Sequence, residues 1–278
     1  MPSPIFTKLP PPDGIDQRKL AEQQARASYS EPAVSVRQVS IASQGRQVPA
    51  RVYTATSRVN PDTILVWFHG GAFIGGDLDM PEAEVVSYEI AHRTGAVVVS
   101  VDYSLVTDDL RFPAPQQDGF AALRWAFHNA GSLGVSKPRV FVGGASAGAC
   151  LAGSVSLLAR DHGYQLAGVL PIYPVAHLEI KEFTPELREV LTEREIEMAT
   201  TMGQLHNPWL LGDSTVEEQQ KWHVFPGDTD DQSGQAAYLF IQSERDALRA
   251  TGQVWLKQLR EAGIGVEDHL LPGADHGF

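Results

Sequence analysis

The chain has 278 residues, of which 43% are hydrophobic and 20% charged, so it can bury a large core and is neither a disordered tail nor a coiled coil. Its 22 Lys and Arg against 34 Asp and Glu give a formal net charge of −12, which repels phosphate backbones and makes nucleic acid a poor partner. A single cysteine, Cys150, excludes an intrachain disulfide and cysteine-rich zinc sites.

The termini and the apolar runs predict a cytoplasmic protein without stable membrane insertion. Residues 1–8 lack the basic start and the continuous apolar run of a secretory signal. Every apolar stretch is shorter than the roughly 18 residues that a membrane span needs. The single cysteine agrees with a reducing compartment.

The first part of the chain predicts an arm followed by a hairpin. Residues 1–35 contain three consecutive prolines and, at 17–28, a polar segment with loose helical spacing. We interpret them as an arm that lies over another part of the fold. From Val34 onward apolar residues alternate with polar ones, which predicts two strands around a turn at 43–46.

The later part of the chain alternates between predicted strands and helices. Runs without polar alternation are typical of strands buried on both faces of a parallel sheet. They lie at 63–68, 96–101, 139–142, 167–172 and 237–241, and a further strand candidate lies at 266–271. Helical patterns at 82–93, 117–128, 147–160 and 251–262 supply the crossovers. The sequence therefore predicts an α/β fold with a mixed, mostly parallel central sheet flanked by helices on both faces.

One region interrupts this alternation. Between 178 and 235 the chain is charged and helical, and a long connection of this kind is usually a functional lid. We expect a cap insertion at 178–235, to which the arm 1–35 contributes, over a core made of 36–177 and 236–278. A solvated surface excursion is the alternative, because its charge pattern suits any exposed helix.

The sharpest chemical signal is the pattern G-x-S-x-G at 144–148, centred on Ser146. It follows a predicted buried strand and precedes a helix rich in small residues. A serine on such a sharp turn projects its hydroxyl above the sheet, and its neighbours must be small because the strained backbone leaves no room. The alternative is an ordinary glycine-rich turn, but the strand-turn-helix context favours a nucleophile.

A second signal, His69-Gly70-Gly71, stands at the end of another predicted strand. Two glycines there let backbone N–H groups turn toward a common point, as a developing oxyanion requires. An ordinary Gly-Gly turn is the alternative. The serine pattern about 75 residues later favours the oxyanion loop, because serine hydrolases of this arrangement use one N–H from such a loop.

A serine nucleophile also needs a base and an orienting acid. Asp246 follows the predicted strand 237–241, and His276 follows the strand candidate 266–271, so both lie at the carboxyl ends of strands, where open α/β sheets place their ligands. Glu244 is the alternative carboxylate. The histidines that we consider less favourable than His276 are His69, in the glycine loop, His223, in the insertion, and His269, inside the last strand.

Five ordered segments carry a family resemblance. The segments are HGGAF at 69–73, VDYSL at 101–105 with FPAP at 112–115, GASAG at 144–148, DALR at 246–249 and DHGF at 275–278. In these segments the chain resembles the hormone-sensitive lipase-like esterases, the α/β hydrolases marked by an HGG loop. The resemblance runs from about residue 63 to the end of the sequence, and it implies the α/β-hydrolase fold with a helical cap.

The resemblance also implies an activity. It indicates a serine carboxylic ester hydrolase for small to medium acyl esters, working through an acyl-enzyme intermediate without a metal or organic cofactor. In this interpretation Ser146 is the nucleophile, His276 the general base and then acid, and Asp246 the residue that orients the imidazole. The oxyanion donors would be the backbone N–H groups of Gly70, Gly71 and Ala147. Phe73 is a candidate for binding substrate, together with the cap positions Leu178, Phe183 and Leu187, and cap-to-core packing is the alternative for these side chains.

Other functions fit the same residues. A ligand-binding protein on a non-catalytic hydrolase scaffold is one alternative, although such proteins tend to lose the histidine that this chain keeps at 276. An amidase or thioesterase would use the same triad. Exposed strand edges near the C-terminus would also allow a homodimer.

The sequence departs from the family pattern at several points. Ala72 stands where a third glycine is frequent, Ala145 replaces a frequent Asp, and Ser104 replaces a frequent Arg, so charged groups that normally brace the loops near the nucleophile are missing. Relatives usually continue into a last helix beyond the histidine, whereas this sequence ends at Phe278. We expect either a truncated chain or a histidine loop that is held by other contacts.

Overall fold

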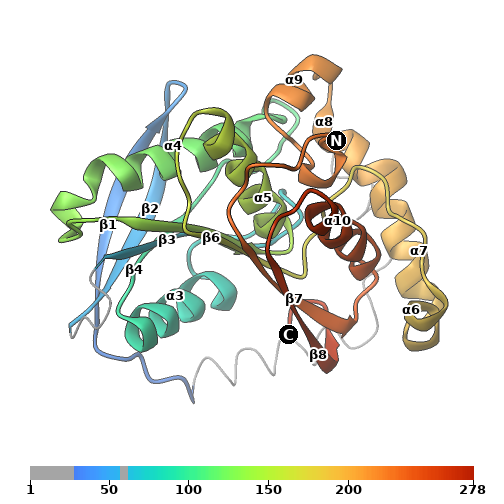
Figure 1. Ribbon diagram of the computed structural model, residues 1–278, viewed down its shortest axis with the longest axis horizontal. Coiled ribbons are helices and arrows are strands. Elements are labelled where there is room, and N and C mark those ends of the chain that lie inside the picture. The colour runs from blue at the N-terminus through green and yellow to red at the C-terminus, as the bar shows by residue number, and fades with distance from the viewer. Residues whose placement is uncertain (1–27, 57–61) are drawn as a thin grey trace.

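The computed structural model describes residues 28–56 and 62–278, so most of the predicted arm, including its helical segment up to residue 27, lies outside the described residues. Eight strands form one sheet in the order β1-β2-β4-β3-β5-β6-β7-β8 (Figure 1). Their bounds are β1 Val34–Ser43, β2 Arg46–Ala55, β3 Thr63–Phe68, β4 Val97–Val101, β5 Arg139–Ala145, β6 Gly168–Ile172, β7 Tyr238–Arg245 and β8 Val266–Asp275.

The sheet is mixed, as predicted. Strand β1 pairs with β2 and β2 with β4 in antiparallel register, and every other neighbouring pair is parallel. The antiparallel hairpin is therefore confined to the N-terminal edge. The carboxyl ends of β3, β5, β6, β7 and β8 point in one direction, so the loops that follow them meet at one edge of the sheet.

The crossover helices lie on both faces of the sheet. Their bounds are α3 Pro81–Thr94, α4 Ala114–Asn129, α5 Ala147–Asp161 and α10 Arg249–Glu261, close to the predicted segments. Alternate side chains of β3 point to opposite faces: Val66 and Phe68 pack in the cluster that contains residues of α4, α5 and α10, whereas Trp67 packs in the cluster that contains residues of α3. Figure 1 shows α3 on one side of the sheet and α4 and α5 on the other.

The connection between β6 and β7 is helical. It contains α6 Pro185–Val190, α7 Glu193–Thr201, a π-helical turn at Met202–His206, α8 Asn207–Leu211 and α9 Val216–Lys221. Threonine side chains accept hydrogen bonds from the first turns of α6, α7 and α9, which explains where these short helices begin. Figure 1 shows α6 and α7 at the right edge of the view, beyond α10, and α9 at the top.

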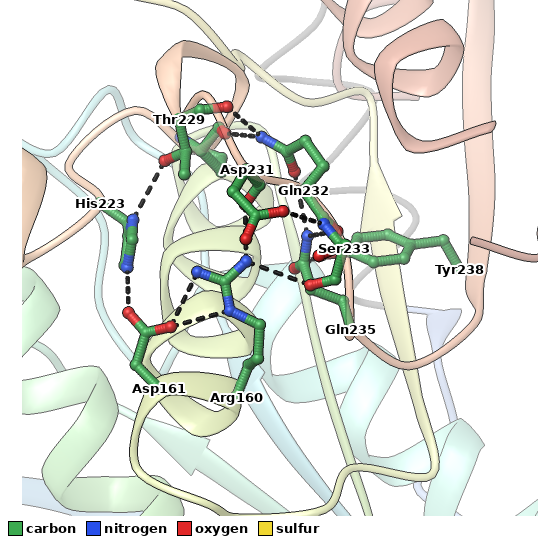
Figure 2. Close-up of polar contacts among 10 residues, drawn as sticks. Arg160, Asp161, His223, Thr229, Asp231, Gln232, Ser233, Gln235 and Tyr238 are labelled. Atoms are coloured by element: carbon green, nitrogen blue, oxygen red, sulfur yellow. Dashed lines mark hydrogen bonds and ion pairs between the residues drawn. The ribbon is translucent and has the colours of Figure 1, made fainter. Parts of the chain in front are cut away.

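The chain returns from these helices to the core along the end of α5. The imidazole of His223 lies between two partners, with Nε2 at 2.7 Å from Asp161 Oδ2 and Nδ1 at 3.0 Å from Thr229 Oγ1. Arg160 donates to the backbone carbonyls of Asp231 and Ser233 (Figure 2). Helix α5 has 15 residues and spans about 22 Å, so His223 lies at the opposite end of this helix from Ser146.

Candidate active site

Ser146 occupies a strained turn between β5 and α5. Its backbone angles are φ 55° and ψ −115°, a conformation that L residues rarely adopt and that recurs at functional sites. A Cβ on Gly144 would lie 2.4 Å from the backbone of Gly148, and a Cβ on Gly148 would lie 2.1 Å from the carbonyl oxygen of Phe68. The two glycines of the pattern are therefore required by the close passage of β3 and α5.

Three side chains from distant parts of the chain form a hydrogen-bonded series at the carboxyl edge of the sheet. Nε2 of His276 lies 2.9 Å from Ser146 Oγ, and Nδ1 lies 2.7 Å from Asp246 Oδ2. Asp246 is buried, with 3% of its surface exposed, and its second oxygen accepts the N–H of Leu248 at 2.8 Å. This arrangement places an imidazole where it can accept the proton of the Ser146 hydroxyl while a fixed carboxylate orients the ring.

The rival residues for these roles lie elsewhere. Glu244 accepts the backbone N–H of Gly273 at 2.6 Å and so fixes the loop before His276 instead of contacting the imidazole. His269 lies on β8, with Nε2 at 2.7 Å from Glu267 Oε1. His69 is buried and stacks on the ring of Tyr103 at 4.4 Å between ring centroids.

Other contacts hold the loop that carries His276. Arg245 forms an ion pair with Asp275 at 3.0 Å and donates to the carbonyl of Gly273 at 2.7 Å. The ring of Tyr173 packs edge-on against the imidazole of His276, with 4.9 Å between centroids, and against Phe278 at 5.3 Å. These contacts hold the loop in the position where His276 reaches Ser146.

The structure corrects one of the three expected oxyanion donors. The backbone N–H of Gly70 donates to the carboxylate of Glu82 at 2.6 Å, so it is not available to a reacting substrate. In the described part of the chain, the N–H groups of Gly71, Ala72 and Ala147 have no hydrogen-bond acceptor. Ala72 has φ 54° and still presents an N–H, although it lacks the freedom of the third glycine that the family often has.

Phe73 is also assigned differently by the structure. Only 1% of its surface is exposed, and its ring packs edge-on against Phe112 at 4.9 Å and against Tyr103 at 6.1 Å. Phe73 therefore packs into the core next to the oxyanion loop and does not line a substrate pocket. Phe183 and Leu187 are likewise buried, in a cluster with Ala247 and Ala250. Their side chains thus pack between cap and core, as in the alternative to substrate binding. Leu178 is partly buried against the main core.

One contact joins the inserted helices to the oxyanion loop. Nε2 of His206, in the π-helical turn, lies 3.0 Å from the carbonyl oxygen of Ala72. Burial lowers the pKa of His206, so the ring is neutral and donates its Nε2–H to this carbonyl. The sequence held no signal for this residue, because its partner lies 134 positions away.

A buried carboxylate holds the loop that carries Ser104. Asp118, on α4, is fully buried and accepts the N–H of Ser104 at 3.0 Å, and Arg46 from β2 forms an ion pair with it at 2.8 Å. The N-terminal hairpin therefore supplies a positive charge to the carboxylate that accepts the Ser104 N–H. The prediction that the loops near the nucleophile lack the charged groups of the family stays a prediction.

Two negative findings concern the described residues alone. Within 28–56 and 62–278, no three His, Cys, Asp or Glu side chains are arranged to hold a metal ion. The helices of the same ranges include none that is both long and apolar enough to cross a bilayer.

The chain matches a known protein family over most of its length. The family model for the alpha/beta hydrolase fold matches residues 65–278. The chain belongs to this family. Its match extends over all three residues of the hydrogen-bonded series and over the oxyanion loop, and it confirms the predicted fold class.

Individual relatives of this alpha/beta hydrolase are esterases. An arylesterase of Saccharolobus solfataricus is 27% identical over 94% of this chain and 83% of its own length. The carboxylesterase NlhH of Mycobacterium tuberculosis is 32% identical over 83% of this chain and 71% of its own length. These similarities confirm the resemblance to the hormone-sensitive lipase-like esterases.

Solved structures give the same result. A structure of an arylesterase superposes with a TM-score of 0.79 at 26% identity. The match covers 98% of this chain and 86% of the arylesterase chain. The structure of a bacterial heroin esterase superposes with a TM-score of 0.77 at 28% identity. This match covers 94% of this chain and 82% of the heroin esterase chain. The alpha/beta hydrolase described here is therefore an enzyme of the hydrolase class.

Proposed function

We propose that this carboxylic ester hydrolase cleaves small to medium acyl esters through an acyl-enzyme formed on Ser146. The observation that carries the proposal is the series Ser146 Oγ, His276 and Asp246, with separations of 2.9 and 2.7 Å. A hydroxyl at its ordinary pKa is a poor nucleophile, and this geometry supplies the base that it needs. The esterase relatives support the same reaction.

The reaction proceeds in two halves. In the first, Ser146 Oγ attacks the ester carbonyl while His276 Nε2 takes the hydroxyl proton, and the imidazolium then gives this proton to the departing alcohol. In the second, water attacks the acyl-enzyme with His276 again as the base, and Ser146 is released with its proton. Asp246 keeps Nδ1 protonated, so that Nε2 is free to accept.

The negative charge of the tetrahedral intermediate needs fixed donors. We assign this role to the N–H groups of Gly71, Ala72 and Ala147, which replace the expected set that included Gly70. Ala147 is the first residue of the 15-residue helix α5, so the helix dipole adds to its hydrogen bond. Donors of this kind typically contribute a factor of about 10² to 10³ each in turnover.

Residues 178–235 act in this proposal as the cap, with the core at 36–177 and 236–278 and an arm at 1–35. The contact of His206 with the carbonyl of Ala72 supports the assignment, because it joins the insertion to the oxyanion loop. A cap in this place limits the length of the acyl or alcohol group that reaches Ser146. We therefore expect a preference for small to medium esters over long-chain lipids.

A panel of matched substrates tests the activity and the size limit together. We expect aryl esters with acyl chains of two to about eight carbons to be hydrolysed fastest, with long acyl chains and the matched anilide at least about 100-fold slower in kcat/KM. The measurement is kcat/KM for esters, thioesters and amides that share one acyl group. Faster cleavage of the amide or thioester would contradict the ester assignment, and fastest cleavage of long acyl chains would contradict the cap.

The non-catalytic alternative makes a different prediction. A ligand-binding scaffold would neither react with a fluorophosphonate probe nor turn over any member of the panel. The intact series of Ser146, His276 and Asp246 favours catalysis over this alternative.

We also infer a homodimer that pairs the outer edges of β8. This strand is the last of the sheet, most of its residues are exposed, and Leu270 presents 44% of its surface. Exposed edge strands offer unpaired N–H and C=O groups to a second copy. Light scattering should give the mass of two chains, and the mass of one chain at tens of micromolar would contradict the dimer.

A further inference from the structure

Glu82 contacts two parts of the active site at once. It is the second residue of α3, and its Oε1 accepts the N–H of Gly70 at 2.6 Å, while its Oε2 accepts the hydroxyl of Tyr173 at 3.2 Å. Its backbone carbonyl accepts the indole N–H of Trp67 at 2.8 Å, which anchors the start of α3 to β3. One side chain therefore joins the loops that follow β3 and β6.

The first contact determines the shape of the oxyanion loop. A Cβ on Gly70 would lie 2.5 Å from Glu82 Oε1, so the carboxylate sits directly against the backbone of this residue. On its other flank the loop is held by the hydroxyl of Tyr103, which donates to the carbonyl of His69 at 2.8 Å. The peptide between residues 69 and 70 is thus fixed at both ends, and the next N–H, that of Gly71, takes its direction from it.

The second contact reaches the histidine. Burial, and then the nearby charge of Glu82, raise the pKa of Tyr173, so its hydroxyl stays protonated and donates to the carboxylate. Tyr173 has φ 38°, a strained angle for a residue with a side chain, and its ring packs on the imidazole of His276 at 4.9 Å. The carboxylate therefore helps to keep this ring in place beside His276.

We propose that Glu82 is a positioning residue for ester hydrolysis: its carboxylate aligns the oxyanion loop through the Gly70 N–H and the imidazole of His276 through Tyr173. The inference rests on the proposed function of the same site. Both contacts act on groups whose alignment matters most in the transition state. Loss of Glu82 should therefore lower kcat and leave KM nearly unchanged.

Three variants and one control test the proposal. Glu82→Ala should lower kcat by about 10- to 100-fold with KM within about twofold, and should weaken inhibition by an aryl trifluoromethyl ketone by the same factor as kcat/KM. Glu82→Gln should keep kcat within about fivefold, since its amide oxygen can accept from Gly70 and its amide N–H can donate to the Tyr173 oxygen. Tyr173→Phe, which removes one contact, should lower kcat by about 3- to 10-fold.

Glu84→Ala is the matched control, because Glu84 lies in the same turn of α3 but pairs with Arg51 at 3.3 Å. It should leave kcat and inhibitor binding unchanged. Rates are divided by the concentration of sites labelled with a fluorophosphonate, so that partly unfolded protein does not count as a loss of kcat. A Glu82→Ala enzyme with the kcat and inhibitor affinity of the parent, or a Glu82→Gln enzyme as slow as Glu82→Ala, would overturn the proposal.

The parent protein separates this failure from failure of the proposed function. If the parent neither hydrolyses esters nor takes the label, the function itself is wrong. If the parent is active and labelled but Glu82→Ala changes only KM or only thermal stability, the ester hydrolase stands and the positioning role of Glu82 is refuted.

Discussion

Ser146→Ala should lower kcat for a short-chain aryl ester by a factor of about 10⁶, close to the loss seen when the nucleophile of a serine hydrolase is removed. The remaining groups still bind the ester and polarise its carbonyl, so a small rate above that of water should persist. The protein should remain folded, because alanine removes one hydroxyl and fits the space. The measurements are steady-state rates, fluorophosphonate labelling and circular dichroism.

Ser154→Ala serves as the control for this variant. Ser154 lies further along the same helix, where its hydroxyl bonds the carbonyl of His223 at 2.6 Å, far from the reacting groups. This variant should lose stability but keep its turnover and its label. Turnover by Ser146→Ala comparable to that of the parent, or labelling of a different serine, would reject Ser146 as the nucleophile.

Asp246→Asn should lower kcat by about 10⁴-fold. The amide that replaces the carboxylate can donate to Nδ1 of His276, which favours the tautomer with the proton on Nε2. This tautomer cannot accept the proton of Ser146, whose Oγ lies 2.9 Å away. The measurement is kcat on the same aryl ester, with the fluorophosphonate labelling rate as an independent report on the reactivity of the serine.

Glu244→Gln is the informative comparison, because Glu244 is the rival carboxylate in sequence. It contacts the backbone of Gly273, 2.6 Å away, so its replacement should reduce kcat by no more than about tenfold through a looser histidine loop. A loss for Glu244→Gln as large as that for Asp246→Asn would move the orienting role to Glu244. Activity close to that of the parent in Asp246→Asn would show that the contact with Nδ1 is dispensable.

The order of strands and helices was largely predictable because it depends on local patterns. Unbroken apolar runs such as 63–68 mark strands buried on both faces, and helical periodicity such as that at 147–160 marks the crossovers. The short helices of the insertion were harder to predict. Helix α8, with five residues, and α9, with six, carry too few turns for a period to emerge.

The site was predictable where chemistry demands particular residues near a strand end, and less so where it depends on neighbours. The strained serine turn requires glycines at fixed spacing, and the structure brings Ser146, Asp246 and His276 together from segments up to 130 positions apart. Phe73 could not be placed by pattern. An aromatic side chain after a glycine loop can face the substrate or the core. Phe73 faces the core because its ring packs against those of Tyr103 and Phe112.

The amino-acid sequence alone determined the class of protein, a serine hydrolase, because the nucleophile turn, the glycine loop and the late histidine can be recognised from short, local patterns. Only the tertiary structure decided which loop N–H groups remain free for an oxyanion. Glu82, on a separate helix, occupies the N–H of Gly70, and His206, from the insertion, bonds the carbonyl of Ala72. Such pairings depend on how distant segments pack, and the spacing of residues along the chain does not predict them.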